Sequence, residues 1–331
     1  MDMTYEALVA YLRACHEWTE ADCLVVGHPA PDGDAVISSV FEGWRRYIAD
    51  GQRAMPVVQA ATLPREVAWL LGELAPLVLT QEAMEAHPTA PLVLTDHHLA
   101  HGRRVLAVVD HHVPAPDVCF GGIPCEIRPV GATTTLVALA CRRQGLVPDR
   151  AVARLLLGGI LLDTDGLLSS KAKAEDHEMA AWLAALAGED CPALFASLRE
   201  QLLAERDVPT LFWRDYRLYE KDSARLGFAI LKVWEDAAPD LDEVRRLLAL
   251  DVAARGLTVC VAKISLYSVA GPRAERYVAA GEPQAAQRVL DAVAAAAGVL
   301  AEKVGTDEVF LPTEAIHRGR KAMAPRLLEV L

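Results

Sequence analysis

The stretch VLAVVDHHV spans residues 105–113. Its uninterrupted apolar start is typical of a strand that is buried on both faces of a parallel sheet. The run ends in Asp110, His111 and His112. Ligands of open α/β sheets bind beyond the carboxyl ends of the strands, which is where these three side chains would lie. The stretch therefore predicts a parallel strand with a functional site at its end.

Two apolar runs further upstream end in a similar way. PLVLTDHH (91–98) ends in an aspartate and two histidines, and CLVVGHPAPDGDAV (23–36) leads into a loop with one histidine and two aspartates. Any single acidic or histidine residue at a strand end is ordinary, but three such ends together favour a metal site. The candidate ligands at these ends are His28, Asp32, Asp34, Asp96, Asp110, His111 and His112.

A fourth element, LLGGILLDTDGLL (156–168), reads as an apolar helix that ends in Asp163, with Asp165 close behind. An aspartate at a helix C-terminus is unfavourable for the helix dipole, and a nearby cation would offset that cost. Many carboxylates and few imidazoles favour Mn²⁺, Mg²⁺ or Co²⁺ over zinc or copper. Two such ions about 4 Å apart would activate a bridging water and hold a phosphoryl group. The pattern therefore predicts hydrolysis of a phosphoester or phosphoanhydride.

The bulk composition narrows the class of protein. A chain of 331 residues is long enough for two domains. A net charge of −12 argues against an extended nucleic-acid partner, and no apolar run has the roughly 20 residues that span a bilayer. The seven cysteines form no CxxC pair, and the N-terminus lacks the features of a secretory signal. We expect a cytoplasmic protein whose partner is a small phosphate-containing substrate, and a homodimer is one option for its oligomeric state.

The order of apolar runs and helical patterns gives the expected architecture. Residues 1–188 should form a doubly wound, mainly parallel α/β sheet, 189–222 a charged connector that is partly loop-like, and 223–331 a smaller mixed α/β domain. In the first domain we expect strands at 24–27, 54–58, 92–95 and 105–109, and helices at 5–15, 35–49, 133–144, 150–161 and 174–187. In the last domain we expect strands at 226–233, 257–266, 276–280 and 308–311, and helices at 241–254 and 284–300.

Three segments could bind an anion. In VGATTTLVAL (130–139), Gly131 and Thr133 at a helix start would expose backbone N–H groups to a phosphate, although threonine there is also an ordinary cap. The segments EAIHRGRKAMAPRLL (314–328) and RDYRLYEK (214–221) are rich in cationic residues. These residues could lie in solvated turns, or they could bind a phosphate and form a phosphate grip. These cations are Arg214, Arg217, Lys221, His317, Arg318, Arg320 and Lys321.

The motifs together resemble the DHH phosphoesterase superfamily. GHPAPDGDAVISS, LTDHH, VVDHH, GATTT and GGILLDT follow its order, and WRDYRLYEKDSARLGFAILKV with the terminal RGRK is similar to its DHHA2 branch. That branch contains manganese-dependent family II inorganic pyrophosphatases and prune-type exopolyphosphatases. The resemblance covers nearly the whole chain and implies a DHH catalytic domain followed by a DHHA2-like domain that closes over the substrate.

The resemblance also implies roles for single residues. His28, Asp32, Asp96 and Asp163 would hold one metal, and the other would be held by Asp34, Asp96, His111 and Asp163. His112 would face the substrate or the leaving oxygen, with Asp110 orienting the histidine pair. Arg217, Arg320 and Lys321 would grip the phosphate.

The chain departs from the pyrophosphatase pattern in places that concern the substrate. His98 stands where asparagine is usual, and Arg217 where lysine is usual. In the sequence HRGRK, either Arg318 or Arg320 could be the arginine that binds the phosphate. We therefore expect His98 and Arg318 to be additional substrate-binding residues, together with Gly131 and Thr133.

The predicted function is hydrolysis of pyrophosphate or short polyphosphate by a metal-bridged water, with two Mn²⁺ ions, or Mg²⁺ or Co²⁺ in their place. One alternative is a phosphodiesterase for short oligonucleotides or cyclic dinucleotides. That activity belongs mainly to the DHHA1 branch of the superfamily, whose GGGH-type motif does not occur after residue 188. A non-catalytic binding protein ranks last, because every predicted metal ligand is present.

Overall fold

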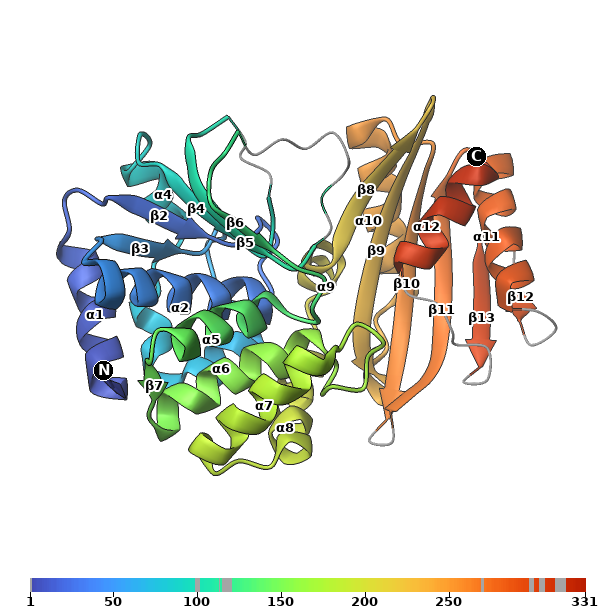
Figure 1. Cartoon of the computed structure of the whole chain (residues 1–331). Helices are drawn as coiled ribbons and strands as arrows, with labels where there is room; N and C mark the ends of the chain where they lie inside the picture. Colours follow the sequence, from blue (N-terminus) through green and yellow to red (C-terminus); the bar gives the residue numbers. More distant parts are fainter. Residues whose placement is uncertain are drawn as a thin grey trace. The chain divides into compact units, whose positions relative to one another are not determined.

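The structure is a computed structural model, and it describes residues 2–98, 102–112, 114, 121–268, 271–297, 301–303, 307–312 and 320–331. The side chains of Asp2, Lys303 and Lys321 lie outside this description. The chain divides into two compact units, Met1–Leu202 and Leu203–Leu331. Each unit is an α/β structure built on its own sheet (Figure 1).

Strands and helices of unit 1 alternate over residues 2–95, and two further strands then follow before the next helix of the described chain. The strands are β1 (Asp2–Met3), β2 (Cys23–Val26), β3 (Ala54–Val57), β4 (Leu92–Thr95), β5 (Val105–Asp110), β6 (Cys125–Ile127) and β7 (Val147–Pro148). The helices are α1 (Tyr5–Glu17), α2 (Gly33–Asp50), α3 (Arg65–Leu71), the 3₁₀ helix η1 (Gly72–Leu77), α4 (Gln81–Ala86), α5 (Thr133–Arg143), α6 (Arg150–Asp163), α7 (Ala174–Ala187) and α8 (Cys191–Leu203).

The main sheet of unit 1 is parallel and has the order β3-β2-β4-β5-β6. The chain adds β3 on one side of β2 and then crosses to add β4 on the other side. The direction of winding therefore reverses between β2 and β4, and in open α/β sheets ligands bind in the crevice at such a reversal. This topology places the segments after β2 and β4 at the expected binding edge.

Both faces of this sheet are buried, which explains its continuous apolar strands. Leu24, Val26 and Leu94 pack into the main core on one face, where α2, α5 and α6 lie (Figure 1). Val25 and Val93 point to the opposite face and belong to a smaller buried cluster. These strands therefore need apolar residues at consecutive positions and not only at every second one.

Unit 2 carries the second sheet and its helices. The strands are β8 (Tyr216–Lys221), β9 (Ala224–Trp234), β10 (Val259–Ser268), β11 (Gly271–Gly281), β12 (Glu302–Lys303) and β13 (Glu308–Pro312). The helices are α9 (Val208–Arg214), the 3₁₀ helix η2 (Glu235–Ala237), α10 (Leu241–Arg255), α11 (Pro283–Ala297) and α12 (Arg320–Glu329). The sheet order is β12-β13-β11-β10-β9-β8, with β9 and β10 parallel and the other neighbours antiparallel.

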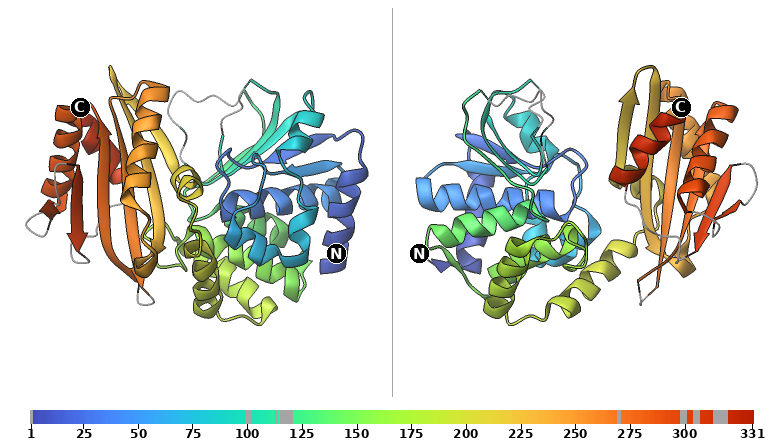
Figure 2. Two further views of the ribbon diagram at one scale, coloured as in Figure 1. Left: turned by 180° about the vertical axis from the view of Figure 1, so that it is seen from behind. Right: turned by 45° about the vertical axis from the view of Figure 1, so that its right-hand side comes forward.

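Helices cover both faces of the second sheet (Figure 2). Apolar residues of α9 and α10 pack on one face together with Leu231 and Ile264. Residues of α11 and α12 pack on the other face together with Phe228 and Val261. The sequence prediction of a parallel α/β sheet followed by a smaller mixed α/β domain is confirmed.

Some elements differ from the sequence prediction. The segment 189–222, expected to be a partly loop-like connector, contains α8, α9 and β8. The sequence does not predict β8 because its charged residues do not form a typical strand pattern. The strand lies at the edge of the sheet, where Glu220 and Lys221 are exposed, and edge strands often carry charges. Strand β6 has three residues and gives almost no periodic signal. Among the described residues, the helices are too short or too polar to cross a membrane.

Candidate metal centre

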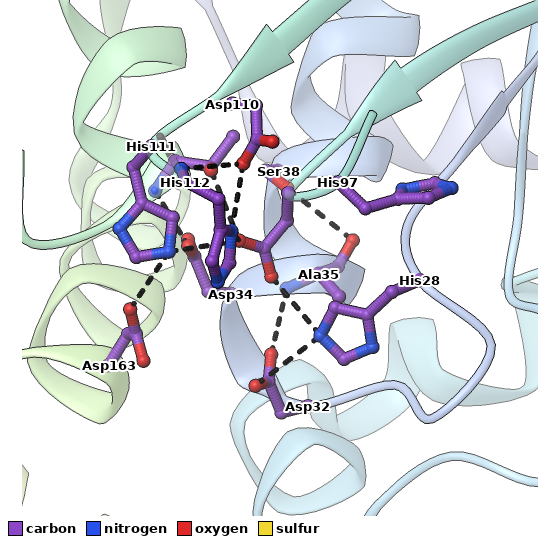
Figure 3. A network of polar contacts seen from close by, with 12 residues as sticks. His28, Asp32, Asp34, Ala35, Ser38, His97, Asp110, His111, His112 and Asp163 are labelled. Atoms are coloured by element: carbon purple, nitrogen blue, oxygen red, sulfur yellow. Dashed lines mark hydrogen bonds and ion pairs between the residues drawn. The ribbon is translucent and has the colours of Figure 1, made fainter. Parts of the chain in front are cut away.

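The acidic and histidine residues singled out in the sequence meet at the carboxyl ends of β2, β4 and β5 (Figure 3). Asp96 directly follows β4, and Asp110 is the last residue of β5. Asp32 is the N-cap of α2, and its side chain accepts the N–H of Ala35 at 3.0 Å. Helix α6 ends at Asp163 and brings a fourth segment to the same place.

One group of potential ligands consists of His28, Asp32 and Asp96, whose ligand atoms all lie within 4.8 Å of one another. His28 Nε2 lies 3.6 Å from Asp32 Oδ2 and 3.4 Å from Asp96 Oδ2. The Asp32 side chain is about half exposed at 47%, whereas that of Asp96 is buried at 2%. These are three of the four residues that the resemblance assigns to the first metal.

The ligand atoms of a second group also lie within 4.8 Å of one another, and this group consists of Asp34, His111 and Asp163. His111 Nε2 lies 3.4 Å from Asp163 Oδ2. That oxygen is buried and has no hydrogen-bond partner in the described part of the chain. A buried carboxylate oxygen that accepts no hydrogen bond, and whose ion-pair partner is the metal-ligand candidate His111, would be satisfied by a divalent cation, so this donor set fits a divalent metal ion.

Asp96 belongs to both halves of the centre. Its Oδ1 lies 3.2 Å from His111 Nε2 and its Oδ2 faces His28. With His111 and His112 it forms a third group of potential ligands. The φ angle of Asp96 is +59°, in the left-handed region that aspartate and asparagine enter more readily than most residues. This conformation turns the carboxylate between the two imidazoles.

Hydrogen bonds fix the orientation of the histidine rings. His111 Nδ1 bonds the carbonyl of Val130 at 3.1 Å, so Nε2 is the atom that faces the carboxylates. His112 contacts Asp110 Oδ1 through both its backbone N–H and its Nδ1, each at 2.9 Å, and this leaves Nε2 for other contacts. His98 Nδ1 lies 2.6 Å from the second oxygen of Asp110. Asp110 therefore orients two imidazoles from neighbouring strands.

The closely spaced carboxylates change the pKa values of the histidines and aspartates in the centre. Burial alone would lower the pKa of His28, but the charges and hydrogen bonds of Asp32 and Asp96 raise it to about 10. The pKa of His111 is also raised to about 10, because contacts with Asp96 and other carboxylates outweigh burial. Burial would raise the pKa of Asp96, but His111 and His28 hold it well below the usual value.

We expect Mn²⁺ binding to release protons, because His28 and His111 bind metal only as neutral imidazoles while their pKa values of about 10 keep them protonated at pH 7. Titration calorimetry in buffers of different ionisation enthalpy should find about two protons released per molecule near pH 7. The affinity for Mn²⁺ should rise between pH 7 and pH 10. An affinity that is flat over this range would contradict the assignment of both imidazoles.

Asp34 is held by the first residues of α5. Its carboxylate accepts the N–H of Thr133 at 2.6 Å, and the N–H and hydroxyl of Thr134 at 2.7 and 2.6 Å. Burial raises the pKa of Asp34, and the charges of Asp96 and Asp163 raise it further. The N–H groups that the sequence suggested for a phosphate are thus donated to a carboxylate of the protein. The expectation that Thr133 binds substrate through its N–H needs this correction.

The expectation that Gly131 binds substrate through its N–H needs the same correction, because this N–H is donated to Asp176 Oδ2 at 2.7 Å. The fully buried Asp176 also accepts the N–H of Lys173 at 2.7 Å and the hydroxyl of Thr135 at 2.6 Å. A Cβ at position 131 would lie 2.8 Å from Asp176 Oδ2 and 2.7 Å from Thr164 Cγ2, so glycine is required there. Asp176 thus fixes the segment that holds Asp34.

We expect Asp176→Ala to destabilise the protein by at least about 2 kcal/mol, because it leaves buried donors without an acceptor. It should also weaken Mn²⁺ binding, since the start of α5 holds Asp34. Asp176→Asn is the matched control: one amide oxygen can still accept both N–H groups, and the Thr135 hydroxyl can turn to accept from the amide. Urea unfolding and a Mn²⁺ titration measure both effects. Equal unfolding midpoints for wild type and Asp176→Ala would refute this role.

The sequence assigned no role to Thr134, Asp176 or Lys171. Lys171 Nζ lies 2.8 Å from Asp163 Oδ1 at the edge of the centre. A threonine in a helix start, an aspartate in a capping position and a lysine in a turn each have ordinary structural explanations. Only the fold brings residues 134 and 176 to Asp34 and Gly131, so no local pattern could have identified them.

The cations predicted for the phosphate lie in unit 2. Arg217 in β8 pairs with Phe228 of β9, and α12 packs on the same sheet face as Phe228. Arg320, the first residue of α12, contacts the carbonyl and the carboxylate of Asp215, each at 2.6 Å. Arg217 donates to the carbonyl of Tyr216 at 3.0 Å. Arg318, His317 and the side chain of Lys321 lie outside the described residues.

Comparisons with known proteins find relatives by sequence and by fold. No family model matches the chain. It is 35% identical over 177 residues to a "Probable manganese-dependent inorganic pyrophosphatase" of Streptococcus suis, and 33% identical over 174 residues to a protein of the same name from Streptococcus pyogenes. Each match covers 50% of this chain and 55% of the relative, so the chain spans about half the length of the curated relatives it matches.

The fold itself has a solved counterpart. The crystal structure of a "putative family II inorganic pyrophosphatase" of Methanococcus jannaschii superimposes with a TM-score of 0.70 and 19% sequence identity. The superposition covers 92% of this chain and 98% of that structure. At this identity the likeness concerns the fold alone. The chain thus has the fold of that structure, and over half its length it is similar to proteins named probable manganese-dependent inorganic pyrophosphatases, a group that its motifs also resemble.

Proposed function

We propose that the protein is a manganese-dependent hydrolase of phosphoanhydrides that acts on pyrophosphate or short-chain polyphosphate. The observation that carries the proposal is the convergence of His28, Asp32, Asp34, Asp96, His111 and Asp163 from four segments onto one edge of the sheet. Curated relatives named manganese-dependent inorganic pyrophosphatases support the choice of metal and of reaction.

The residues divide into those that would hold metal and those that would handle the substrate. His28, Asp32 and Asp96 would hold one ion, Asp34, Asp96 and His111 a second, and Asp163 would serve both. Bound divalent ions supply a water of lowered pKa and neutralise charge on the phosphoryl oxygens. His112, positioned through Asp110 and 36% exposed, would direct Nε2 to the substrate or the leaving oxygen.

Unit 2 would supply the phosphate grip. Arg217 and the N-terminus of α12 lie on one face of its sheet, so Arg217 and Arg320 could act on the same group. The resemblance adds Lys321 to them. Asp215 holds the guanidinium of Arg320 through two contacts, which orders its remaining N–H groups. Arg318 would be an additional contact. His98 would line the substrate side, with its ring fixed by Asp110.

One assay tests the proposal. The full chain with Mn²⁺ is offered pyrophosphate, tripolyphosphate and a dinucleotide in parallel, and phosphate or nucleotide release is measured. We expect either anhydride to be hydrolysed much faster than the dinucleotide. A preference for the dinucleotide would establish the phosphodiesterase alternative, and no turnover of any of the three substrates would favour a non-catalytic binding protein.

A further inference from the structure

We infer that Lys171 of unit 1 binds a phosphate oxygen of the substrate, as a cation additional to those of unit 2. This inference rests on the proposed function and names a further specificity-determining residue of the same site. Lys171 comes eight residues after the metal-ligand candidate Asp163, and its Nζ lies 2.8 Å from Asp163 Oδ1.

The backbone returns Lys171 to the centre by an unusual turn. Asp165, Gly166 and Leu167 all have positive φ angles, of 52°, 68° and 69°. Left-handed conformations cost free energy at the two non-glycine positions, so the surrounding structure must hold the turn. Thr164 does so, since its carbonyl accepts the N–H of Ser169 at 3.0 Å and its hydroxyl accepts the N–H of Leu167 at 3.1 Å. The place of Lys171 is therefore specified by the fold.

The side chain of Lys171 is more exposed to solvent than those of its partner Asp163 and of Asp96. The side chain of Lys171 is 43% exposed, whereas Asp163 is 17% and Asp96 is 2% exposed. Lysine is an ammonium cation at neutral pH, so Lys171 places a positive charge beside Asp163 where solvent reaches its side chain.

Charge explains why the centre needs such a group. A phosphate that approaches four aspartates meets repulsion, which cations at the rim reduce. Among the described residues, Lys171 is the lysine or arginine that forms an ion pair with one of the predicted metal-binding carboxylates. Its contacts with Asp163 Oδ1 and, at 3.5 Å, the Asp163 carbonyl leave a third N–H to donate to a phosphate oxygen.

The test uses the full chain loaded with Mn²⁺ and imidodiphosphate, a pyrophosphate analogue that resists hydrolysis. Lys171→Ala should weaken imidodiphosphate binding in calorimetry by at least about tenfold, the lower range for a charge-assisted hydrogen bond. The KM for pyrophosphate should rise similarly, while Mn²⁺ affinity is unchanged or tighter. Lys171→Arg should retain most of the binding, since it keeps the charge.

Lys173→Ala is the matched control, because Lys173 is exposed and its Nζ bonds the carbonyl of Ser170 instead of a carboxylate of the centre. It should bind imidodiphosphate as the wild type does. If Lys171→Ala binds Mn²⁺ more tightly but imidodiphosphate unchanged, Lys171 is only an ion-pair partner of Asp163 and the inference is wrong. If the wild type itself neither hydrolyses pyrophosphate nor binds the analogue, the proposed function fails as well.

Discussion

Asp96→Asn is expected to lower hydrolysis of pyrophosphate by well over a hundredfold, beyond the 10–100-fold range typical for loss of an outer-shell partner of a metal ligand. Asp96 contacts both His28 and His111, so its charge serves both halves of the centre. Asparagine has nearly the same shape and tolerates the left-handed backbone at this position, so the fold should be preserved.

The readout is kcat together with Mn²⁺ affinity and the unfolding midpoint. Asp50→Asn, an exposed carboxylate at the end of α2, is the control and should behave as the wild type. A variant at position 96 that keeps more than about a tenth of the activity would contradict a two-metal centre built around this carboxylate.

Chelation should abolish activity completely, and Mn²⁺ or Co²⁺ should restore it better than Zn²⁺, because the donors are mostly carboxylates with a minority of imidazoles. Calcium should inhibit, since its longer and more flexible coordination does not match the in-line geometry. Mn²⁺ should also raise the melting temperature, because it binds the folded chain and relieves repulsion among the aspartates.

Thermal unfolding with and without chelator measures this effect independently of turnover. The same series on Asp96→Asn serves as the control and should show a much smaller shift with Mn²⁺. Full activity in excess chelator would remove metal from the proposed function.

The sequence predicts where the candidate ligands come together because several of them follow apolar strands directly. In a parallel sheet every such strand ends at the same edge, so the positions of Asp96 and Asp110 along the chain suffice to bring them together. The four strands predicted in unit 1 lie within one residue of their observed bounds, whereas the short strands β1, β6 and β7 are not predicted. Continuous apolar runs buried on both faces explain this success.

The sequence does not predict which polar groups pair across the fold. Gly131 and Asp176 are 45 residues apart, and the anion at the start of α5 is Asp34 instead of a phosphate. The sequence of a helix start looks the same whether its N–H groups bind a carboxylate of the protein or a phosphate. The strand β8 was hidden by the charges of an edge position, and the role of Lys171 depends on a left-handed turn that local propensity disfavours.

The hydrogen bonds between α5 and Asp34 have a consequence for how the protein acquires its ions. Because Thr133 and Thr134 place this carboxylate through contacts within the protein, folding and not the ion assembles that part of the site. Loading should therefore resemble capture by a rigid receptor, with a small heat-capacity change in contrast to metal-induced folding. Chains made without manganese should accept it later without refolding, so the supply of ions around the finished protein decides which metal it carries.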